Sequence, residues 1–315
     1  MKALRFERFG DLDVLEIVEV PRPQPGRGEI LVEVRAASIN PSDVKNVQGK
    51  MEGTTLPRTP GRDFAGYVVE GPPALKGAEV GGAGGDIGFT RDGAHAEYIV
   101  VPEDGVSLKP SLLSFEEAAA VGVNFVAAWS GLHDSAQAGA GETVLVTGSA
   151  GGVGSSVVQL ARWMGATSIG VDRKQQMLFL PDHLRPDFSL PAEEDVLAGV
   201  RRMTGDRGVD VVYDTVGQPL FELNLAALAH DGRYALIASA GERRTSFDLL
   251  DFYHKRLVLH GVDTRALDTR ACARILDHLR PGFDSSRLRP PRIAQRFPLA
   301  DAKRAYEAVN AGAAG

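Results

Sequence analysis

A glycine-rich turn between an apolar strand and a helix constrains this chain more than any other feature. The segment reads GETVLVTGSAGGVGSSVVQLARWMGA over residues 141–166. Its run TVLVT is continuously apolar, which is typical of a strand buried on both faces of a parallel sheet. Glycines allow a tight turn and a close backbone approach to a pyrophosphate, and the free N–H groups that begin the helix attract phosphates. The strand–turn–helix context therefore predicts a dinucleotide-binding unit.

Secondary-structure signals differ between the two parts of the chain. The first 115 or so residues read as strands and turns, with alternating segments such as EILVEV and AEYIVV, and predict a small barrel. From SFEE at 114–117 onwards a capped apolar helix is expected. Strands and helices then alternate, which predicts an α/β fold with a doubly wound parallel sheet and right-handed crossovers. Expected strands are 143–147, 167–171, 209–213, 233–237 and 257–261, and expected helices are 155–164, 221–229, 269–280 and 299–311.

Composition excludes several classes of partner. A length of 315 residues suggests two domains. The 41 acidic residues outnumber the 35 basic ones, for a formal charge of −6, and argue against binding to nucleic acid or an anionic membrane. The start MKALRFERFG lacks a signal-peptide pattern, and no apolar run approaches the roughly 20 residues that span a bilayer, so a cytoplasmic setting is expected. The single cysteine, Cys272, rules out an intramolecular disulfide and a multi-cysteine zinc site.

Residues after the later strands are expected to complete the cofactor site. Asp172 follows the second strand of the unit, where a carboxylate accepts hydrogen bonds from ribose hydroxyls and repels a 2′-phosphate, which favours NADH. Arg173 and Lys174 come next and could instead pair with the 2′-phosphate of NADPH, so both cofactors stay open. The residues predicted to bind the cofactor are Gly148, Ser149, Ala150, Gly151, Gly152, Val153, Asp172, Arg173, Lys174, Val216, Gly217, Ser239 and Ala240.

Residues 141–162 resemble the signature of the zinc-independent quinone oxidoreductase (zeta-crystallin-like) branch of the medium-chain dehydrogenase/reductases. The matching residues are GE at 141–142, Leu145, SA at 149–150, Gly151, Gly152, Val153, Gly154, Gln159 and Arg162. The opening MKALRFERFGDLDVLEIVEVPRPQPG, the segments LPRTPGRDFAGYVVEG and GAHAEYIVVP, the motif YDTVG and the late YEAVNAG extend the likeness over nearly the whole chain.

The resemblance implies a Rossmann domain inserted in a GroES-like β-barrel. The barrel domain, for substrate and catalysis, would comprise residues 1–121 and 261–315, and the dinucleotide-binding domain residues 122–260. It also implies a cofactor and substrate cleft between the domains, a preference for NADPH, and a homodimer formed through the last Rossmann strand. Relatives usually carry a final barrel strand, whereas this sequence ends at Gly315, so the barrel either closes differently or the sequence is truncated.

Zinc ligands are missing where the zinc alcohol dehydrogenases of the superfamily have them. Those enzymes have a Cys within the segment corresponding to SINPSD at 38–43, and a His-Glu pair at the positions of Arg62 and Asp63. Asp43, Asp63 and His95 are conceivable ligands, but their type and number suit zinc poorly. We therefore expect no metal, and we expect Arg62 and Asp63 to form an ion pair in its place.

Two residues are predicted to take part in catalysis. Asn40 matches the family's asparagine near the nicotinamide and could donate a hydrogen bond to a developing oxyanion, or could be a turn residue before Pro41. Lys45 stands where relatives often have a tyrosine, and could supply a proton or be a solvated surface lysine.

These features favour a zinc-free NAD(P)H-dependent oxidoreductase that passes hydride to a quinone or an α,β-unsaturated carbonyl. Such acceptors are already activated, so they need less help than an alcohol does from a Lewis acid. The alternatives are an enoyl-thioester reductase, a zinc-type alcohol dehydrogenase, and a nucleotide-binding protein without turnover. The sequence leaves open the physiological substrate and the proton donor.

Overall fold

The computed structural model describes residues 1–178 and 180–312, and the chain forms two compact units within it. One unit contains residues 1–126 and 264–315, and the other contains residues 127–263. Gly315, where the sequence ends, lies outside the described residues. No helix in the described ranges combines the length and the apolar character needed to cross a membrane.

The first unit is built around a five-stranded antiparallel sheet with the order β6-β3-β4-β5-β7. Its strands are β3 (Glu29–Ala36), β4 (Asp63–Glu70), β5 (Glu79–Ala83), β6 (Tyr98–Pro102) and β7 (Ser107–Leu108). A separate ribbon pairs β1 (Lys2–Arg5) with β2 (Glu16–Glu19). Apolar side chains that alternate along β3, β4 and β6, among them Ile30, Val32 and Phe64, form the barrel core.

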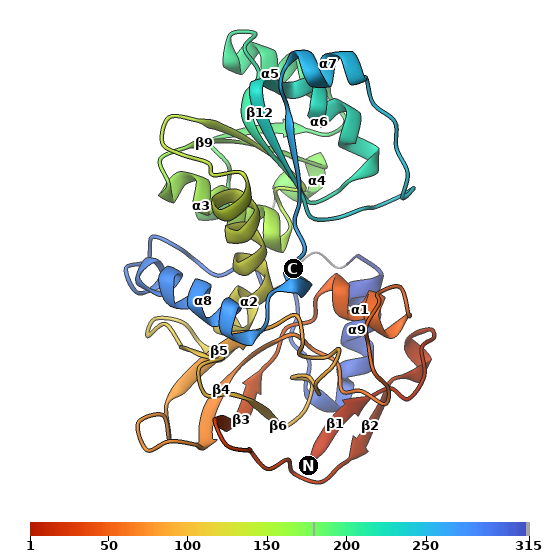
Figure 1. The fold of residues 1–315 in the computed structure, drawn as a ribbon, viewed down its shortest axis with the longest axis vertical. Coiled ribbons are helices and arrows are strands. Elements are labelled where there is room, and N and C mark those ends of the chain that lie inside the picture. The colour runs from red at the N-terminus through yellow and green to blue at the C-terminus, as the bar shows by residue number, and fades with distance from the viewer. Residues whose placement is uncertain (179, 313–315) are drawn as a thin grey trace. The chain divides into compact units, whose positions relative to one another are not determined.

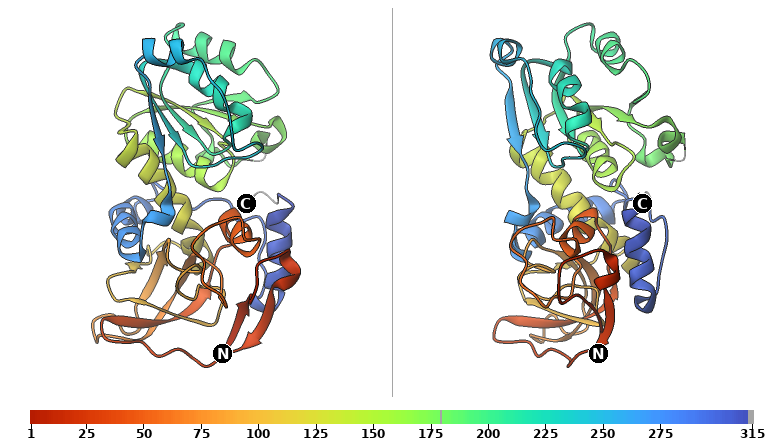
Figure 2. Two further views of the ribbon diagram at one scale, coloured as in Figure 1. Left: turned by 45° about the vertical axis from the view of Figure 1, so that its right-hand side comes forward. Right: turned by 90° about the vertical axis from the view of Figure 1, so that its right-hand side faces the viewer.

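Helices from both parts of the sequence complete this unit. They are α1 (Pro41–Val47), α2 (Phe115–Trp129), which begins in this unit, α8 (Thr269–Asp284) and α9 (Ala302–Asn310). The helix α8 packs on β5 and β7, and α9 packs on α1 near the β1–β2 ribbon (Figures 1 and 2). Tyr306 of α9 is fully buried among side chains of the N-terminal segment, including Leu4 and Phe6. The barrel unit is thus held together by apolar contacts between the two ends of the chain.

The second unit is a six-stranded parallel sheet with the order β10-β9-β8-β11-β12-β13. The strands are β8 (Thr143–Thr147), β9 (Thr167–Asp172), β10 (Phe188–Pro191), β11 (Val209–Asp214), β12 (Leu228–Leu236) and β13 (Val258–Gly261). The helices are α3 (Gly152–Trp163), α4 (Lys174–Leu178), α5 (Val196–Thr204), α6 (Phe221–Ala227) and α7 (Leu249–His254). Strand order reverses between β8 and β11, which is the topological switch point where such sheets bind ligands.

Helices lie on both faces of this sheet (Figure 2). The helix α3 packs on β8 and β9, whereas α6 packs on β11 and β12 and contacts α5 (Figure 2). The predicted fold class, a doubly wound Rossmann sheet with a GroES-like barrel, is confirmed. The predicted helices at 269–280 and 299–311 correspond to α8 and α9. The short helix α1 and the helix α5 were not predicted.

Candidate functional site

The glycine-rich turn joins β8 to α3 and leaves the start of α3 without a side-chain cap. Gly148 has a φ of +72°, a conformation that favours glycine, and its amide donates to Val171 O at 2.9 Å. A Cβ on Gly154 would lie 2.1 Å from Gly148 O, so this glycine lets the helix pack against the turn. The N-cap residue Gly151 contributes no side-chain oxygen to the first N–H groups of α3. These groups are available for an anion such as a pyrophosphate.

Asp172 ends β9 beside this turn. Its Oδ2 accepts a hydrogen bond from Ala150 N at 2.9 Å, and its Oδ1 accepts one from Arg173 N at 2.8 Å. Asp172 is half-buried, whereas Arg173 and Lys174 are exposed. Asp172, which favours NADH, and the two basic residues, which favour NADPH, thus lie next to one another at one end of the sheet.

The loops after β11 and β12 adjoin the turn. Thr215 Oγ1 donates to Thr147 O at 2.8 Å, which ties the loop after β11 to the last residue of β8. Ala240 N donates to Val216 O at 2.8 Å and joins the loop after β12 to the same place. The structure therefore brings the predicted cofactor-binding residues together at the carboxyl ends of four neighbouring strands, β9, β8, β11 and β12.

The buried aspartate of the YDTVG motif holds these loops, a role that the sequence analysis did not predict. Asp214 Oδ1 accepts hydrogen bonds from Thr147 Oγ1 at 2.6 Å, Val216 N at 2.8 Å and Gly217 N at 3.0 Å. Asp214 Oδ2 accepts one from Tyr234 Oη at 2.6 Å. Burial and the neighbouring carboxylate raise the pKa of the Tyr234 hydroxyl, so it stays protonated as a donor. The available sequence signal for this role was the position of Asp214, directly after the expected buried strand 209–213.

Asn40 lies in the barrel unit, at the N-cap of α1, and only 7% of it is exposed. Its Nδ2 donates to Asp63 Oδ2 at 2.7 Å and to Asp43 Oδ2 at 3.3 Å. Its backbone N donates to Asp43 Oδ2 at 2.7 Å. The amide hydrogens are therefore directed at carboxylates, and donation to an oxyanion would require one of these bonds to be exchanged.

Asp43 and Asp63 are both fully buried, and burial raises the pKa of each to about 6. Asp43 Oδ1 has no hydrogen-bond partner, which adds to the cost of its charge. Asp63 also accepts hydrogen bonds from Ser38 Oγ at 2.7 Å and from Val123 N at 2.9 Å. Hydrogen bonds join four residues into one cluster, which we call the Asp63 cluster: Ser38, Asn40, Asp43 and Asp63.

His95 borders the Asp63 cluster in its neutral form. Its Nε2 lies 2.9 Å from Ser38 O, and its Nδ1 lies 2.9 Å from Tyr306 Oη. A carbonyl oxygen only accepts, so Nε2 carries the proton and Tyr306 donates to Nδ1. Burial lowers the pKa of His95 to about 4.

The predicted ion pair between Arg62 and Asp63 is wrong. Arg62 is buried, but its Nε donates to Gly84 O at 3.0 Å and its Nη2 donates to Thr264 O at 3.1 Å. The Arg62 guanidinium thus donates to backbone carbonyls, whereas the Asp63 carboxylate accepts hydrogen bonds from side-chain and backbone donors. The two residues were expected to pair in place of a metal, but neighbouring residues of an extended strand point to opposite faces.

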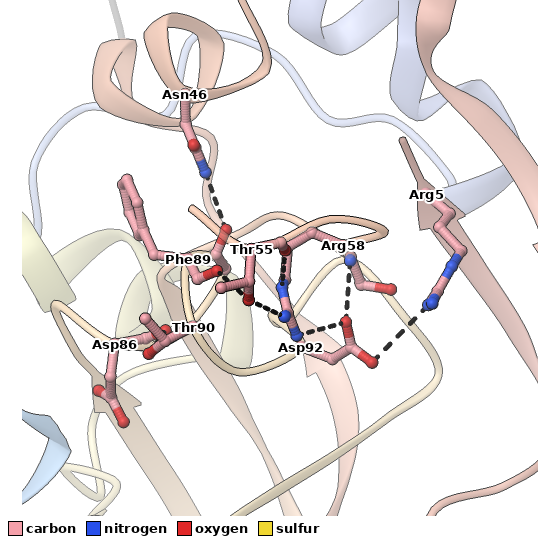
Figure 3. Close-up of polar contacts among 10 residues, drawn as sticks. Arg5, Asn46, Thr55, Arg58, Asp86, Phe89, Thr90 and Asp92 are labelled. Atoms are coloured by element: carbon pink, nitrogen blue, oxygen red, sulfur yellow. Dashed lines mark hydrogen bonds and ion pairs between the residues drawn. The ribbon is translucent and has the colours of Figure 1, made fainter. Parts of the chain in front are cut away.

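Lys45 is exposed on α1, whereas its neighbour Asn46 is buried and bonds the helix to nearby loops. Asn46 Nδ2 donates to Gly88 O at 2.8 Å, and Thr54 Oγ1 donates to Asn46 Oδ1. Figure 3 shows Asn46 directed into the loops that contain Phe89, with the Asp92 ion pairs beside them. The buried Asn46 thus fixes α1, and the Lys45 ammonium is free to meet solvent or a ligand.

Two family models match most of the chain between them. Residues 26–111 match the alcohol dehydrogenase GroES-like domain, and residues 152–278 match the zinc-binding dehydrogenase family. A zinc-type alcohol dehydrogenase-like protein of Schizosaccharomyces pombe is 37% identical over 294 residues, covering 91% of this chain and 86% of that protein. The quinone oxidoreductase of Sus scrofa is 28% identical and covers 98% of this chain and 94% of that protein.

Further similarity extends to an enone reductase and to solved structures. A 2-methylene-furan-3-one reductase of Solanum lycopersicum is 37% identical over 69% of this chain and 58% of that protein. A mycobacterial protein solved with NADPH superimposes with a TM-score of 0.86 at 27% identity, covering 100% of this chain and 98% of that one. An NAD-dependent alcohol dehydrogenase superimposes with a TM-score of 0.88 at 28% identity, covering 99% and 96%. The chain is an oxidoreductase that belongs to the medium-chain dehydrogenase/reductase superfamily.

Proposed function

We propose that this protein is a zinc-independent reductase that uses NADPH or NADH to reduce quinones or α,β-unsaturated carbonyl compounds. The observation that carries the proposal is the chemistry of the Asp63 cluster, which contains positions where the family resemblance implies metal ligands in the zinc dehydrogenases. The similarity to a quinone oxidoreductase and to an enone reductase supports the same substrate class.

The residues of the Asp63 cluster do not fit a zinc ion. Zinc needs about four nitrogen, sulfur or carboxylate ligands in a tetrahedron. Both oxygens of Asp63 already accept hydrogen bonds, and both ring nitrogens of His95 are engaged by Ser38 O and Tyr306 Oη. Within residues 1–178 and 180–312, no three His, Cys, Asp or Glu side chains gather in a group that could hold a metal ion. The proposed reaction therefore uses no zinc ion.

The second unit has the residues to hold a dinucleotide. We assign pyrophosphate binding to the N–H groups at the start of α3, and adenosine ribose binding to Asp172. The loops at Val216–Gly217 and Ser239–Ala240 would contact the nicotinamide half. When bound, the reduced nicotinamide supplies a hydride to an activated carbon of the acceptor. The protein contributes alignment of the two reacting carbons and donors for the oxygen that gains negative charge.

Cofactor selection is assigned to residues 172–174. Asp172 favours NADH, because its carboxylate would repel a 2′-phosphate. The exposed cations Arg173 and Lys174 favour NADPH. Relatives of both kinds exist, since one similar structure was solved with NADPH and another is an NAD-dependent dehydrogenase. We propose that Asp172 shifts the balance toward NADH without abolishing NADPH use.

Lys45 and Asn40 are the proposed catalytic residues of the barrel unit. The Lys45 ammonium is exposed and can deliver a proton to an enolate or hydroquinone oxygen. Asn40 can donate to such an oxygen only by exchanging its bond to Asp43 or Asp63. The longer bond, at 3.3 Å to Asp43, is the weaker of the two and would exchange first.

We further propose a homodimer that pairs through β13. This strand forms one edge of the parallel sheet, and Val258 and Leu259 on it are 46% and 40% exposed. An edge strand with exposed apolar side chains can add a second copy antiparallel to itself.

The test of this function is consumption of NADH and NADPH by the purified protein with one quinone and one enone as acceptors. Metal content is measured on the same sample, and the assay is repeated after chelation. Turnover that survives chelation supports the proposal, and turnover that needs added zinc contradicts it.

A further inference from the structure

The Asp63 carboxylate receives hydrogen bonds from three segments that lie far apart in the sequence. Ser38 Oγ and Asn40 Nδ2, from the loop before α1, each donate to Asp63 Oδ2 at 2.7 Å. Val123 N, in the middle of α2, donates to Asp63 Oδ1 at 2.9 Å. Asp63 itself is the first residue of β4 and is fully buried. A single carboxylate thus joins a loop, a strand and a helix.

The helix α2 is shaped to receive this carboxylate. Gly122 departs from helical geometry, with φ −18° and ψ −110°. A Cβ at Gly122 would lie 2.4 Å from Asp63 Oδ1, so only glycine leaves room for the oxygen. The N–H of Val123 then acts as the free donor at the start of a new helical segment, where a carboxylate is the preferred partner. The kink in α2 and the position of Asp63 therefore depend on each other.

The charge of Asp63 is satisfied by these donors rather than by a paired cation. Arg62, the adjacent cation, is bonded to Gly84 O and Thr264 O. The charge of Arg62 still lowers the pKa of Asp63 from a distance, whereas the neighbouring Asp43 carboxylate raises it. Losing any one of the three donors would leave a buried carboxylate short of partners, which is costly. The three segments are thereby held in one arrangement.

We propose that Asp63 is a positioning residue for the reaction: it holds the Asn40 amide and the segment of α2 that begins at Val123 in a fixed mutual arrangement. This inference rests on the proposed function for the role of Asn40 near the substrate. A displacement of about 1 Å in a positioned group can cost about 100-fold in rate. Replacing Asp63 should therefore lower kcat much more than it weakens cofactor binding, since the cofactor-binding residues belong to the other unit.

The experiment compares Asp63→Asn, which keeps the shape and removes the charge, with Ser38→Ala, which removes one donor. The control is Ser107→Ala, which removes the hydrogen bond that another buried serine of the barrel unit makes to a carboxylate, from Ser107 Oγ to Asp277 Oδ1 at 2.7 Å. Each variant is assayed for kcat, KM and the Kd of NADH and NADPH. The side-chain amide signals of Asn40 are followed by NMR on asparagine-labelled protein, assigned with Asn40→Ser.

In Asp63→Asn we expect a loss of kcat of about 100-fold and an unchanged Kd for the cofactor. In the wild type, the hydrogen bond to Asp63 should shift the Asn40 amide signal to low field and protect it from exchange, and this signal should be lost in the variant. Ser38→Ala should cause a several-fold loss of kcat, and it tests the proposal if Asp63→Asn does not fold. A shifted Asn40 signal with kcat unchanged in the folded variants would overturn the proposal. An equal loss of kcat in Ser107→Ala would also overturn it, because the effect would then be general destabilisation. Failure of the proposed function can be told apart from failure of the positioning role of Asp63. In the first case the wild type itself would show the Asn40 signal but no turnover.

Discussion

The carboxylate of Asp172 accepts a hydrogen bond from the backbone N–H of Ala150 at 2.9 Å, which connects the end of β9 to the glycine-rich turn after β8. The residue that would select the cofactor also stabilises the loop that would hold its phosphates. A substitution at Asp172 therefore acts on both.

Asp172→Ala should raise the ratio of kcat/KM for NADPH to that for NADH by about tenfold, because the variant lacks the carboxylate that repels a 2′-phosphate and binds ribose hydroxyls. Affinity for both cofactors should fall somewhat, since Ala150 N–H loses its partner. Steady-state kinetics with both cofactors measure the ratio. Asp182→Ala, at a highly exposed aspartate of the same unit, is the control. An unchanged ratio in Asp172→Ala would refute the assignment.

Lys45→Met should lower kcat by about 100-fold if the ammonium delivers the proton to the reduced acceptor. The Kd of the cofactor, measured by nicotinamide fluorescence, should not change. Lys50→Met provides a matched exposed lysine beyond the end of α1. Equal turnover in both variants and the wild type would make Lys45 a solvated surface residue.

Gly154→Ala should destabilise the protein by about 1–3 kcal/mol and weaken cofactor binding, because the new methyl group would overlap Gly148 O and push α3 away from the turn. Urea unfolding and cofactor titration measure the two effects. Gly139→Ala is the control, since its Cβ would meet only Glu142 Oε2 at 4.0 Å. Wild-type stability and affinity in Gly154→Ala would contradict the close packing of the turn on the helix.

The buried His95 should make the fold less stable in acid. Its pKa falls from 6.5 in the unfolded chain to about 4 in the folded protein, so its contribution is complete above pH 6.5 and is lost as the pH falls toward 4. Asp43 and Asp63 act in the opposite direction, because their raised pKa values make the folded state bind more protons between about pH 4 and 6. Comparing the wild type with His95→Gln isolates the histidine, since both proteins keep the two carboxylates.

The free energy of unfolding of the wild type, relative to His95→Gln, should therefore decline by up to about 3 kcal/mol between pH 7 and pH 4. Urea titrations across this range measure the difference. A constant difference would show that His95 titrates in the folded protein as it does in the unfolded chain.

Replacing Leu259 by lysine on the edge strand β13 should dissociate the proposed dimer. Sedimentation of the wild type should give twice the 33.6 kDa mass of the chain, and the variant should give that mass itself. Leu112→Lys, at a leucine that is 60% exposed in the barrel unit, should stay dimeric. A monomeric wild type would rule the dimer out.

The parallel sheet and its glycine-rich turn were predictable because their signals are local. A buried strand, a glycine turn and a helix follow one another within residues 141–166. The helix α1 was not predicted because it is only seven residues long and begins at a proline. A segment of this length is too short for a helical spacing of apolar residues to be recognised. Its buried residues Val44 and Val47 belong to the same apolar cluster as Tyr306, which lies near the other end of the sequence.

The sequence analysis considered Asp43 and Asp63 together only as conceivable zinc ligands, and it did not predict the hydrogen bonds that join the Asp63 cluster. Its members come from residues 38–43 and from the start of β4, the middle of α2 donates to it through Val123 N, and no local pattern shows that these segments meet. The ion pair between Arg62 and Asp63 was expected because both stand at positions of metal ligands in the zinc enzymes, whereas in the structure each residue has other hydrogen-bond partners. Asp214, which ends β11, lies in the recognisable motif YDTVG, but only the structure shows the loops that its carboxylate binds.

The most direct test of the central claim is a single-turnover measurement on chelator-treated protein whose metal content has been determined. Protein in excess over NADH, and separately over NADPH, is mixed with a quinone or an enone, and the loss of reduced-nicotinamide absorbance is followed against a sample without protein. The account predicts complete, protein-dependent oxidation of at least one cofactor by at least one acceptor without metal. Measurable cofactor binding with no oxidation by either acceptor, or oxidation that returns only with added zinc, would contradict it.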